Sequence, residues 1–317
     1  METAFAKRIR IANDKASYDA ACKRLLSEKM ILAWIMKECV QEYAGMDVRE
    51  IAGYIEGIPQ VSETPVSPDE TNASFVDGRS TEDKSLNEGT VTYDIRFFAL
   101  APGTGEPLRL LINVEAQNDF YPGYPLIKRG IYYCSRMISS QYGTEFTDSH
   151  YEKIKKVYSI WICMNPPKHR ENTITGYSLQ EKNIIGSVQE KPENYDLLTA
   201  VMVCLGSHEK ADPHGVLRLL EVLLSTDTDT EEKKKVLEED YDIPMEQTLE
   251  REVELVCNLS KGVEEKGIQK GIQQGIEQNM LTSIQNLMET LKMTADQAMI
   301  ALKVPESDRS KYFSMLK

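Results

Sequence analysis

Three polar residues with the chemistry of a metal site lie within two otherwise apolar segments. Asp94 belongs to VTYDIRFFAL at 91–100, and Glu115 and Gln117 lie near the end of LRLLINVEAQ at 108–117. Side chains of a strand alternate between its faces, so Glu115 and Gln117 share one face, opposite the apolar residues between them. A buried carboxylate is costly unless hydrogen bonds or a cation satisfy it. The pattern therefore indicates either a hydrogen-bond network or a bound cation.

The same two segments have the sequence of a β-hairpin. Both are rich in strand-forming residues, and the Gly- and Pro-containing APGTGEP at 101–107 separates them. If the strands pair around this turn, Asp94 and Glu115 converge at one end of the sheet. Mg²⁺ takes one or two carboxylates together with waters and phosphate oxygens, and such an ion activates water for attack on a phosphodiester. Hydrogen bonds to neighbouring backbone or to Arg96 are an equally weighted alternative, because so short a pattern also arises by chance.

The elements around the hairpin follow from hydrophobic periodicity. Apolar residues at helical spacing predict a long buried helix at 19–44 and a helix at 126–142, and the apolar run at 155–165 predicts a buried strand. A further hairpin is expected at 172–186, and the polar segment 60–90 is expected to be an extended loop. The order helix, strand, strand, helix, strand predicts an α/β fold with a mixed central sheet flanked by helices.

The sequence after residue 195 predicts helices, including the apolar segments 196–206 and 215–225. The tail at 261–317 is distinct, because KGIQKGIQQGIEQN repeats Gly-Ile every four residues. Glycine costs about 1 kcal/mol relative to alanine inside a helix, so we expect a weakly self-associating helix or a linker here. Two short helices around Val304 and Pro305 should close the chain. The expected homo-oligomer would form through this tail.

Composition places the 317-residue chain among globular proteins of a reducing compartment. It has 41% hydrophobic and 27% charged residues, six scattered cysteines and no apolar run long enough to cross a membrane. We therefore expect a cytoplasmic protein that makes no membrane contact. The formal charge of −13 gives no support to non-specific DNA binding, which relies on Lys and Arg. Two local basic groups, at 153–156 and 168–170, are interpreted as solvated surface.

Three segments together carry a family resemblance: VTYDIRFFA, LLINVEAQNDFYPGYPLIKRGIYYCSRMISSQYGTEF and KKVYSIWICMNPP. They resemble the PD-(D/E)XK nuclease family transposases, which are related to the bacterial recombination-promoting nucleases (Rpn). The resemblance covers the chain from about residue 25 to residue 205. It implies a restriction-endonuclease-like core, cleavage of DNA with Mg²⁺ or Mn²⁺, and a link to recombination or transposition. The expected domains are then a nuclease-like domain at 1–195, a helical extension at 196–260 and the tail at 261–317.

The resemblance also assigns roles to residues. Asp94 matches the motif aspartate, Glu115 the second metal ligand, and Gln117 occupies the position of the motif lysine. Lysine stabilises developing negative charge, whereas a neutral amide only donates a hydrogen bond. The missing cation is therefore expected from the following helix, where Arg129 lies one turn from Tyr133 and faces the same way. An ordinary surface ion pair is the equally weighted alternative for Arg129.

A further acidic residue on the first helix is expected to complete the site. The candidates are Glu28, Glu38 and Glu42, with Glu42 weakly favoured. The leading hypothesis is an Mg²⁺-dependent DNA endonuclease. A degenerate relative that binds DNA or protein without cleavage is the alternative, favoured by the acidic charge and by Gln117 but opposed by the intact Asp94 and Glu115. A structural protein that oligomerises through its tail is the third possibility.

Overall fold

The computed structural model describes residues 16–61, 82–85, 89–102, 108–117, 120–206, 215–225 and 228–316. The chain divides into two compact units, residues 1–260 and 261–317. The larger unit contains the hairpin that carries Asp94 and Glu115. The functional domain boundaries expected from the sequence stay predictions.

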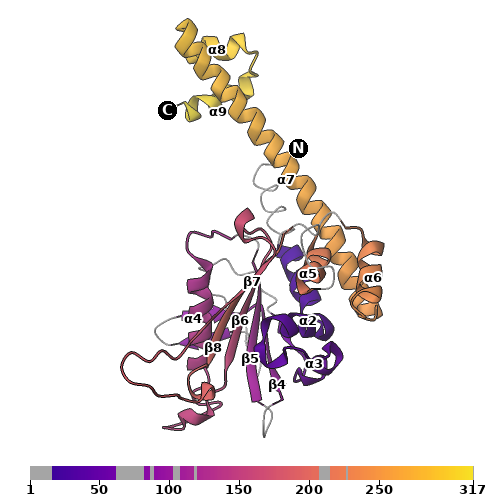
Figure 1. Ribbon diagram of the computed structural model, residues 1–317. Coiled ribbons are helices and arrows are strands. Elements are labelled where there is room, and N and C mark those ends of the chain that lie inside the picture. Colours follow the sequence, from indigo (N-terminus) through magenta and orange to yellow (C-terminus); the bar gives the residue numbers. More distant parts are fainter. Residues whose placement is uncertain are drawn as a thin grey trace. The chain divides into compact units, whose positions relative to one another are not determined.

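The larger unit is built on a six-stranded mixed sheet (Figure 1). Across the sheet its strands are β1 (Gln60–Val61), β4 (Ile95–Ala101), β5 (Leu108–Gln117), β6 (Val157–Cys163), β8 (Leu198–Cys204) and β7 (Thr173–Ser178). The predicted hairpin is confirmed, because β4 pairs antiparallel with β5. The predicted strand at 155–165 is confirmed as β6, which runs parallel to β5 and to β8. A separate two-stranded sheet pairs β2 (Glu82–Ser85) with β3 (Gly89–Thr92).

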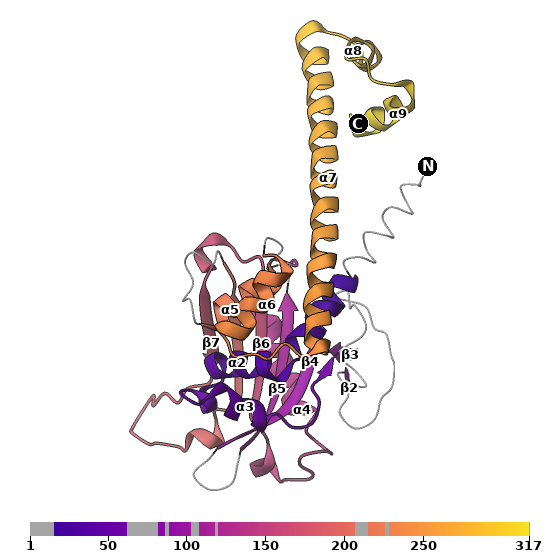
Figure 2. The same ribbon diagram turned by 90° about the vertical axis from the view of Figure 1, so that its right-hand side faces the viewer.

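Helices cover both faces of this sheet (Figures 1 and 2). One face packs against α2 (Lys29–Cys39), α3 (Val48–Tyr54), α5 (Val216–Leu224), α6 (Thr230–Glu239) and the first turns of α7 (Gln247–Leu291). The other packs against α4 (Leu126–Ser139), which connects β5 to β6. Every residue of β6 is buried, as expected for a central parallel strand covered on both faces. The predicted α/β architecture with helices on both faces is therefore present.

The single long helix predicted at 19–44 is wrong. The structure has one helix at residues 16–26, called the first helix below, and then α2. The break lies at Ser27 and Glu28. The hydroxyl of Ser27 donates to the carbonyl of Arg24 (2.6 Å), and Glu28 has extended backbone, with φ −63° and ψ 131°. Hydroxyl side chains compete with helical hydrogen bonds in this way, whereas hydrophobic periodicity continues unchanged across the break.

The helix predicted at 196–206 is also wrong, because this segment forms β8. Short apolar runs do not distinguish a buried strand from a buried helix. The β-branched Thr199, Val201 and Val203 favour a strand, and β6 and β7 pair with its two edges. The hairpin predicted at 172–186 is correct only in its first strand: β7 pairs with β8 rather than with the residues that follow it.

The smaller unit has its own apolar core. α8 (Ala295–Ala301) and α9 (Glu306–Met315) confirm the two short helices expected there. Thr294 begins α8 with a capping box, in which its side chain and that of Gln297 each bond the other's backbone N–H. The core side chains are Leu281, Ile284, Ala298, Met299, Val304 and Tyr312. The Gly-Ile repeat belongs to α7, and self-association through it stays a prediction. No helix in the described ranges is long and apolar enough to cross a membrane.

Gly130 marks a close approach between α4 and the sheet. A Cβ atom at this position would lie 3.1 Å from Met202 Cε and 3.2 Å from Trp161 Nε1. We expect Gly130→Val to lower the free energy of unfolding by about 2 kcal/mol, because inserting methyl groups into a packed core forces strain. Urea denaturation measures this change.

Gly53→Ala in α3 is the matched control, because no atom lies within 4 Å of its added Cβ. It should raise stability by up to ~1 kcal/mol, through helix propensity alone. An equal effect of the two substitutions would contradict the close packing of α4 on the sheet.

Candidate active site

Asp94 and Glu115 lie side by side at one end of the β4–β5 hairpin. Ile95, the first residue of β4, pairs with Val114 in the ladder, so Asp94, the residue just before β4, lies at the level of Glu115. The backbone N–H of Asp94 donates to Glu115 Oε1 (3.0 Å), and the backbone N–H of Ala116 donates to Asp94 Oδ2 (3.1 Å). Glu115 is only 4% exposed. The two predicted carboxylates therefore meet, Glu115 buried and Asp94 partly buried, and each accepts a hydrogen bond from the backbone of the other's segment.

A lysine from the first helix reaches this pair. Lys23 Nζ lies 2.7 Å from Asp94 Oδ1 and 2.6 Å from Asp19 Oδ2. Lys23 is 4% exposed. Asp19 and Lys23 are one helical turn apart, which is the spacing at which opposite charges on a helix pair. The site thus contains a cation that the sequence pattern around Gln117 does not provide.

Arg129 lies on α4, the helix that covers the face of the sheet to which Glu115 points. Its Nε and one terminal nitrogen donate to the Tyr133 hydroxyl (3.1 and 2.6 Å), and the other terminal nitrogen donates to the Tyr124 hydroxyl (3.1 Å). The guanidinium also lies over the Tyr133 and Trp161 rings, 5.1 and 5.2 Å from their centroids. Arg129 is therefore held by aromatic residues, as the shared helix face with Tyr133 predicts, rather than by a surface ion pair.

Gln117 ends β5 two residues after Glu115, on the same face of the strand by alternation. It pairs in register with Cys163 of β6 and is partly buried. The four sequence-predicted site residues thus lie around the end of β5. Three are on the hairpin and one is on the helix that follows it.

The surroundings of the site disfavour the ionised form of both carboxyl groups. Burial raises the pKa of both carboxyl groups, and the charge of Asp94 raises the pKa of Glu115 further. Lys23 and Arg129 oppose this rise, Lys23 at both groups and Arg129 at Glu115. For Lys23, burial alone would lower the pKa, but Asp94 and Asp19 raise it above its ordinary value. An additional positive charge would stabilise both carboxylates in their ionised form.

The donor set suits a hard divalent ion. Mg²⁺ needs only one or two protein carboxylates, because waters and substrate phosphates complete its shell. Asp94 and Glu115 supply two. The described residues contain no group of three or more His, Cys, Asp or Glu side chains able to hold a metal, so a zinc-type site built wholly from protein ligands does not form among them.

The glutamates considered on the predicted helix at 19–44 lie away from the Asp94–Glu115 pair. Glu42 accepts a hydrogen bond from the Tyr158 hydroxyl (2.5 Å) and pairs with Lys156 (3.0 Å). Lys156 is 13% exposed and also pairs with Asp196. It is therefore not solvated surface, as was expected for the basic group at 153–156 to which it belongs. The acidic side chain that the first helix brings to Lys23 is Asp19 instead.

Glu28 and Glu38 also have neighbours other than the carboxylate pair. Burial raises the pKa of Glu28, and its carboxylate neighbours Glu246 and Glu252 raise it further. Glu38 lines a polar cavity that also contains Asp196. The break after residue 26 explains the difference from expectation, because α2 does not continue the face that carries Lys23.

Lys23 and Asp19 are the site residues that sequence reasoning missed. A signal for Lys23 exists: it lies among Ala21, Cys22, Leu25 and Leu26, all of which are buried. A charged residue on the apolar side of a helix needs a partner, but the sequence does not name that partner.

No protein-family model, curated protein or solved structure matches the chain. The family assignment therefore stays a prediction from the sequence. Any inference about function is based on the geometry of the described residues.

We expect Glu115→Gln to change the pH dependence of stability. The pKa of Glu115 is raised on folding, so the native state retains a proton that the unfolded chain releases above about pH 4.5. Wild-type stability should therefore fall relative to the variant as pH rises above about 4.5. Glutamine keeps an oxygen that accepts the Asp94 N–H and carries no charge.

Urea unfolding at several pH values, with chelator present, measures this difference. Parallel stability curves for wild type and Glu115→Gln would show that the carboxyl group is ionised equally in both states.

We expect Lys23→Met to lower the free energy of unfolding by about 3 kcal/mol at neutral pH, because it leaves the partly buried Asp94 without its cation. Adding Asp94→Asn should recover part of this loss. The control is Arg49→Met, since Arg49 pairs with Asp242 where both side chains are about 70% exposed and an exposed pair contributes little. Additive effects of Lys23→Met and Asp94→Asn would argue against a coupled pair.

Proposed function

We propose that this protein is a metal-dependent DNA endonuclease of the PD-(D/E)XK class, with a restriction-endonuclease-like core. The observation that carries the proposal is the pairing of the partly buried Asp94 with the buried Glu115 at the end of the β4–β5 hairpin, with Lys23 bonded to Asp94. Charged groups with so little exposure cost free energy to maintain. Phosphodiester hydrolysis is the chemistry that uses such a set.

Asp94 and Glu115 would hold Mg²⁺ or Mn²⁺. When bound, the ion would stabilise negative charge on the scissile phosphate and lower the pKa of the attacking water. Lys23 fixes the orientation of Asp94 and supplies the positive charge that Gln117 does not. Gln117 would orient the water or a phosphate oxygen by a hydrogen bond. Arg129, held by two tyrosine hydroxyls, would stabilise charge on the phosphate from α4, on the face of the sheet to which Glu115 points.

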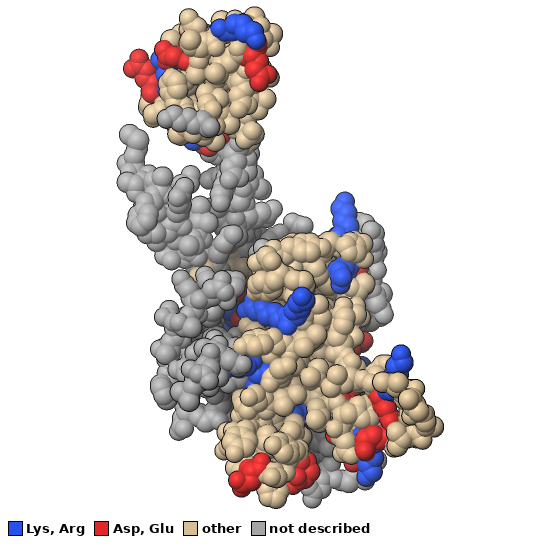
Figure 3. All heavy atoms as spheres, turned by 90° about the vertical axis from the view of Figure 1, so that its left-hand side faces the viewer, with Lys and Arg blue, Asp and Glu red and all other residues tan. Residues whose placement is uncertain are grey.

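Basic residues near the site support DNA as the substrate. α4 has no acidic residue, and its first turns carry Lys128, which is exposed, and Arg129, which is partly exposed, although the whole chain carries a net charge of −13. Figure 3 shows the side of the molecule on which α4 lies: Lys and Arg are spread over the middle of the larger unit, and Asp and Glu gather toward its lower end. Cations in that arrangement can neutralise phosphates locally. The family resemblance adds the proposal that cleavage serves recombination or transposition.

We expect purified protein to nick supercoiled plasmid with Mg²⁺ or Mn²⁺ and not with chelator. Asp94→Asn and Glu115→Gln should each reduce the nicking rate at least about a hundredfold, because each removes a charged ligand at the reacting phosphate. Glu42→Gln is the matched control: it changes a carboxylate bonded to Tyr158 and Lys156 and should nick like wild type.

Thermal unfolding with and without Mg²⁺ gives a second readout that is independent of activity. Mg²⁺ should stabilise wild type and Glu42→Gln, because an ion that binds the folded state raises its stability. It should not stabilise Glu115→Gln, which lacks one of the two metal ligands. Metal-dependent stabilisation without nicking would favour the catalytically degenerate DNA-binding or protein-interaction module. Nicking that survives both Asp94→Asn and Glu115→Gln would contradict the site assignment.

A further inference from the structure

An aromatic pocket lies at the end of the parallel strands next to the carboxylate pair. It has a volume of about 460 Å³, within the range of about 300–1,000 Å³ that small-molecule sites occupy. Its walls come from three places: the segment 120–127 between β5 and α4, the turn after β6, and strands β7 and β8. The lining side chains include Phe120, Tyr121, Tyr124, His169, Arg170 and Tyr177.

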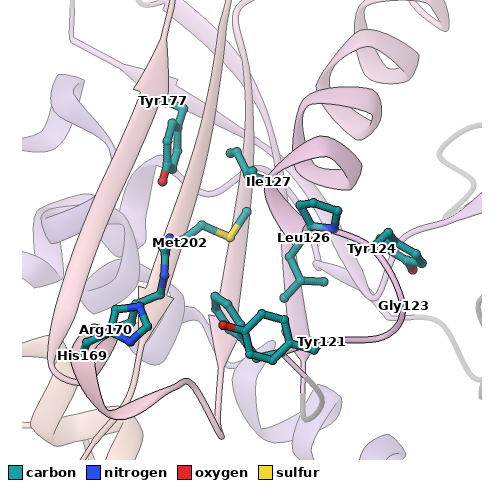
Figure 4. Close-up of a pocket in the computed structure, with 11 residues that line it drawn as sticks. Tyr121, Gly123, Tyr124, Leu126, Ile127, His169, Arg170, Tyr177 and Met202 are labelled. Atoms are coloured by element: carbon teal, nitrogen blue, oxygen red, sulfur yellow. The ribbon is translucent and has the colours of Figure 1, made fainter.

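The close-up in Figure 4 shows how these walls face one another. Met202 of β8 lies between Tyr177 on one side and Leu126 on the other, and His169 and Arg170 lie together near the edge. Met202 is buried, whereas Tyr121 is 66% exposed. The pocket therefore has a closed apolar floor and a rim of aromatic and cationic side chains that solvent reaches.

The chemistry of the lining selects a planar, negatively charged ligand. Four of the lining residues carry phenyl or phenol rings, and none of the eleven described lining residues is acidic. The Arg170 guanidinium lies 5.6 Å from the centroid of the Phe120 ring, so a cation and an aromatic face are presented together. Nucleobases stack on such rings whatever their sequence, and Arg contributes both stacking and phosphate contact.

One residue joins this pocket to the candidate active site. Tyr124 lines the pocket, and its hydroxyl accepts a hydrogen bond from Arg129 (3.1 Å). Arg129 in turn lowers the pKa of Glu115 through its charge. A strand whose phosphate lies at the carboxylate pair would therefore have a neighbouring nucleotide close to the pocket.

We propose that the pocket receives one nucleobase of the DNA strand, unstacked from its neighbours, while Arg170 contacts an adjacent phosphate. This inference rests on the proposed nuclease function, because it assigns the part of the substrate that the carboxylate pair does not hold. Bases leave a stack at least cost where the strand is already single or mispaired. The expected preference is therefore for single-stranded or distorted DNA.

The test is equilibrium binding of a short strand of abasic deoxyribose phosphates that carries a single 2-aminopurine, in chelator so that metal-dependent cleavage does not occur. Stacking in the pocket should quench the fluorescence of 2-aminopurine. The same strand without any base should compete at least about tenfold more weakly, since stacking on aromatic side chains contributes at least this much per base. Free 2-aminopurine deoxyribonucleoside monophosphate should also bind more weakly than the strand.

Two pairs of variants make the test specific. Tyr121→Ala should weaken binding of the base-containing strand about tenfold, whereas Tyr142→Ala should not. Both tyrosines are more than 60% exposed and both pack edge-to-face on a phenylalanine, so the substitutions are matched. Arg170→Gln should weaken binding, and Lys168→Gln, which removes a charge from the same short helix η3 (Lys168–Arg170) outside the pocket, should not.

Three results would overturn the inference. The first is equal binding of the base-containing and base-free strands, and the second is equal loss in Tyr121→Ala and Tyr142→Ala. The third is a free nucleotide that binds as tightly as the strand, which would make the pocket a nucleotide site. Because these measurements need no cleavage, a protein that binds the base but never nicks DNA would refute the nuclease and leave the base pocket established.

Discussion

The partly buried carboxylate of Asp94 joins the first helix to both strands of the β4–β5 hairpin. Its two oxygens accept hydrogen bonds from Lys23 and from the backbone of β5, and its own amide donates to Glu115. Each bond compensates part of the cost of burying charge. The first helix and both strands of the hairpin are therefore held in one geometry by polar contacts as well as by apolar packing. A site that depends on fixed carboxylates needs this rigidity.

The hairpin could be predicted from sequence because its information is local. Alternation of apolar residues and the turn at 101–107 determine β4, β5 and the shared face of Glu115 and Gln117. The helix α4 and the strand β6 are equally clear from periodicity. Asp94 and Glu115 could be paired for the same reason, since they are 21 residues apart across one turn.

What could not be predicted depends on contacts between distant segments. Hydrophobic periodicity predicts a helix where β8 lies, because so short an apolar run does not distinguish a helix from a strand without the pairing to β6 and β7. The role of Lys23 depends on where the first helix docks, which no local pattern records. His169 and Arg170 look like solvated surface in the sequence, and they are exposed, but the fold places them at the rim of an aromatic pocket.

The position of Lys23 also has a kinetic consequence for how the protein assembles. Lys23 and Asp94 are roughly 70 residues apart in the chain, whereas few residues separate β4 from β5. Contacts between distant segments are entropically costly to form early. The hairpin is therefore expected to form, with its two carboxylates together, before the first helix packs against it and Lys23 pairs with Asp94. The contact between Lys23 and Asp94 would then form late in folding, so that it would mainly slow unfolding and have little effect on the folding rate.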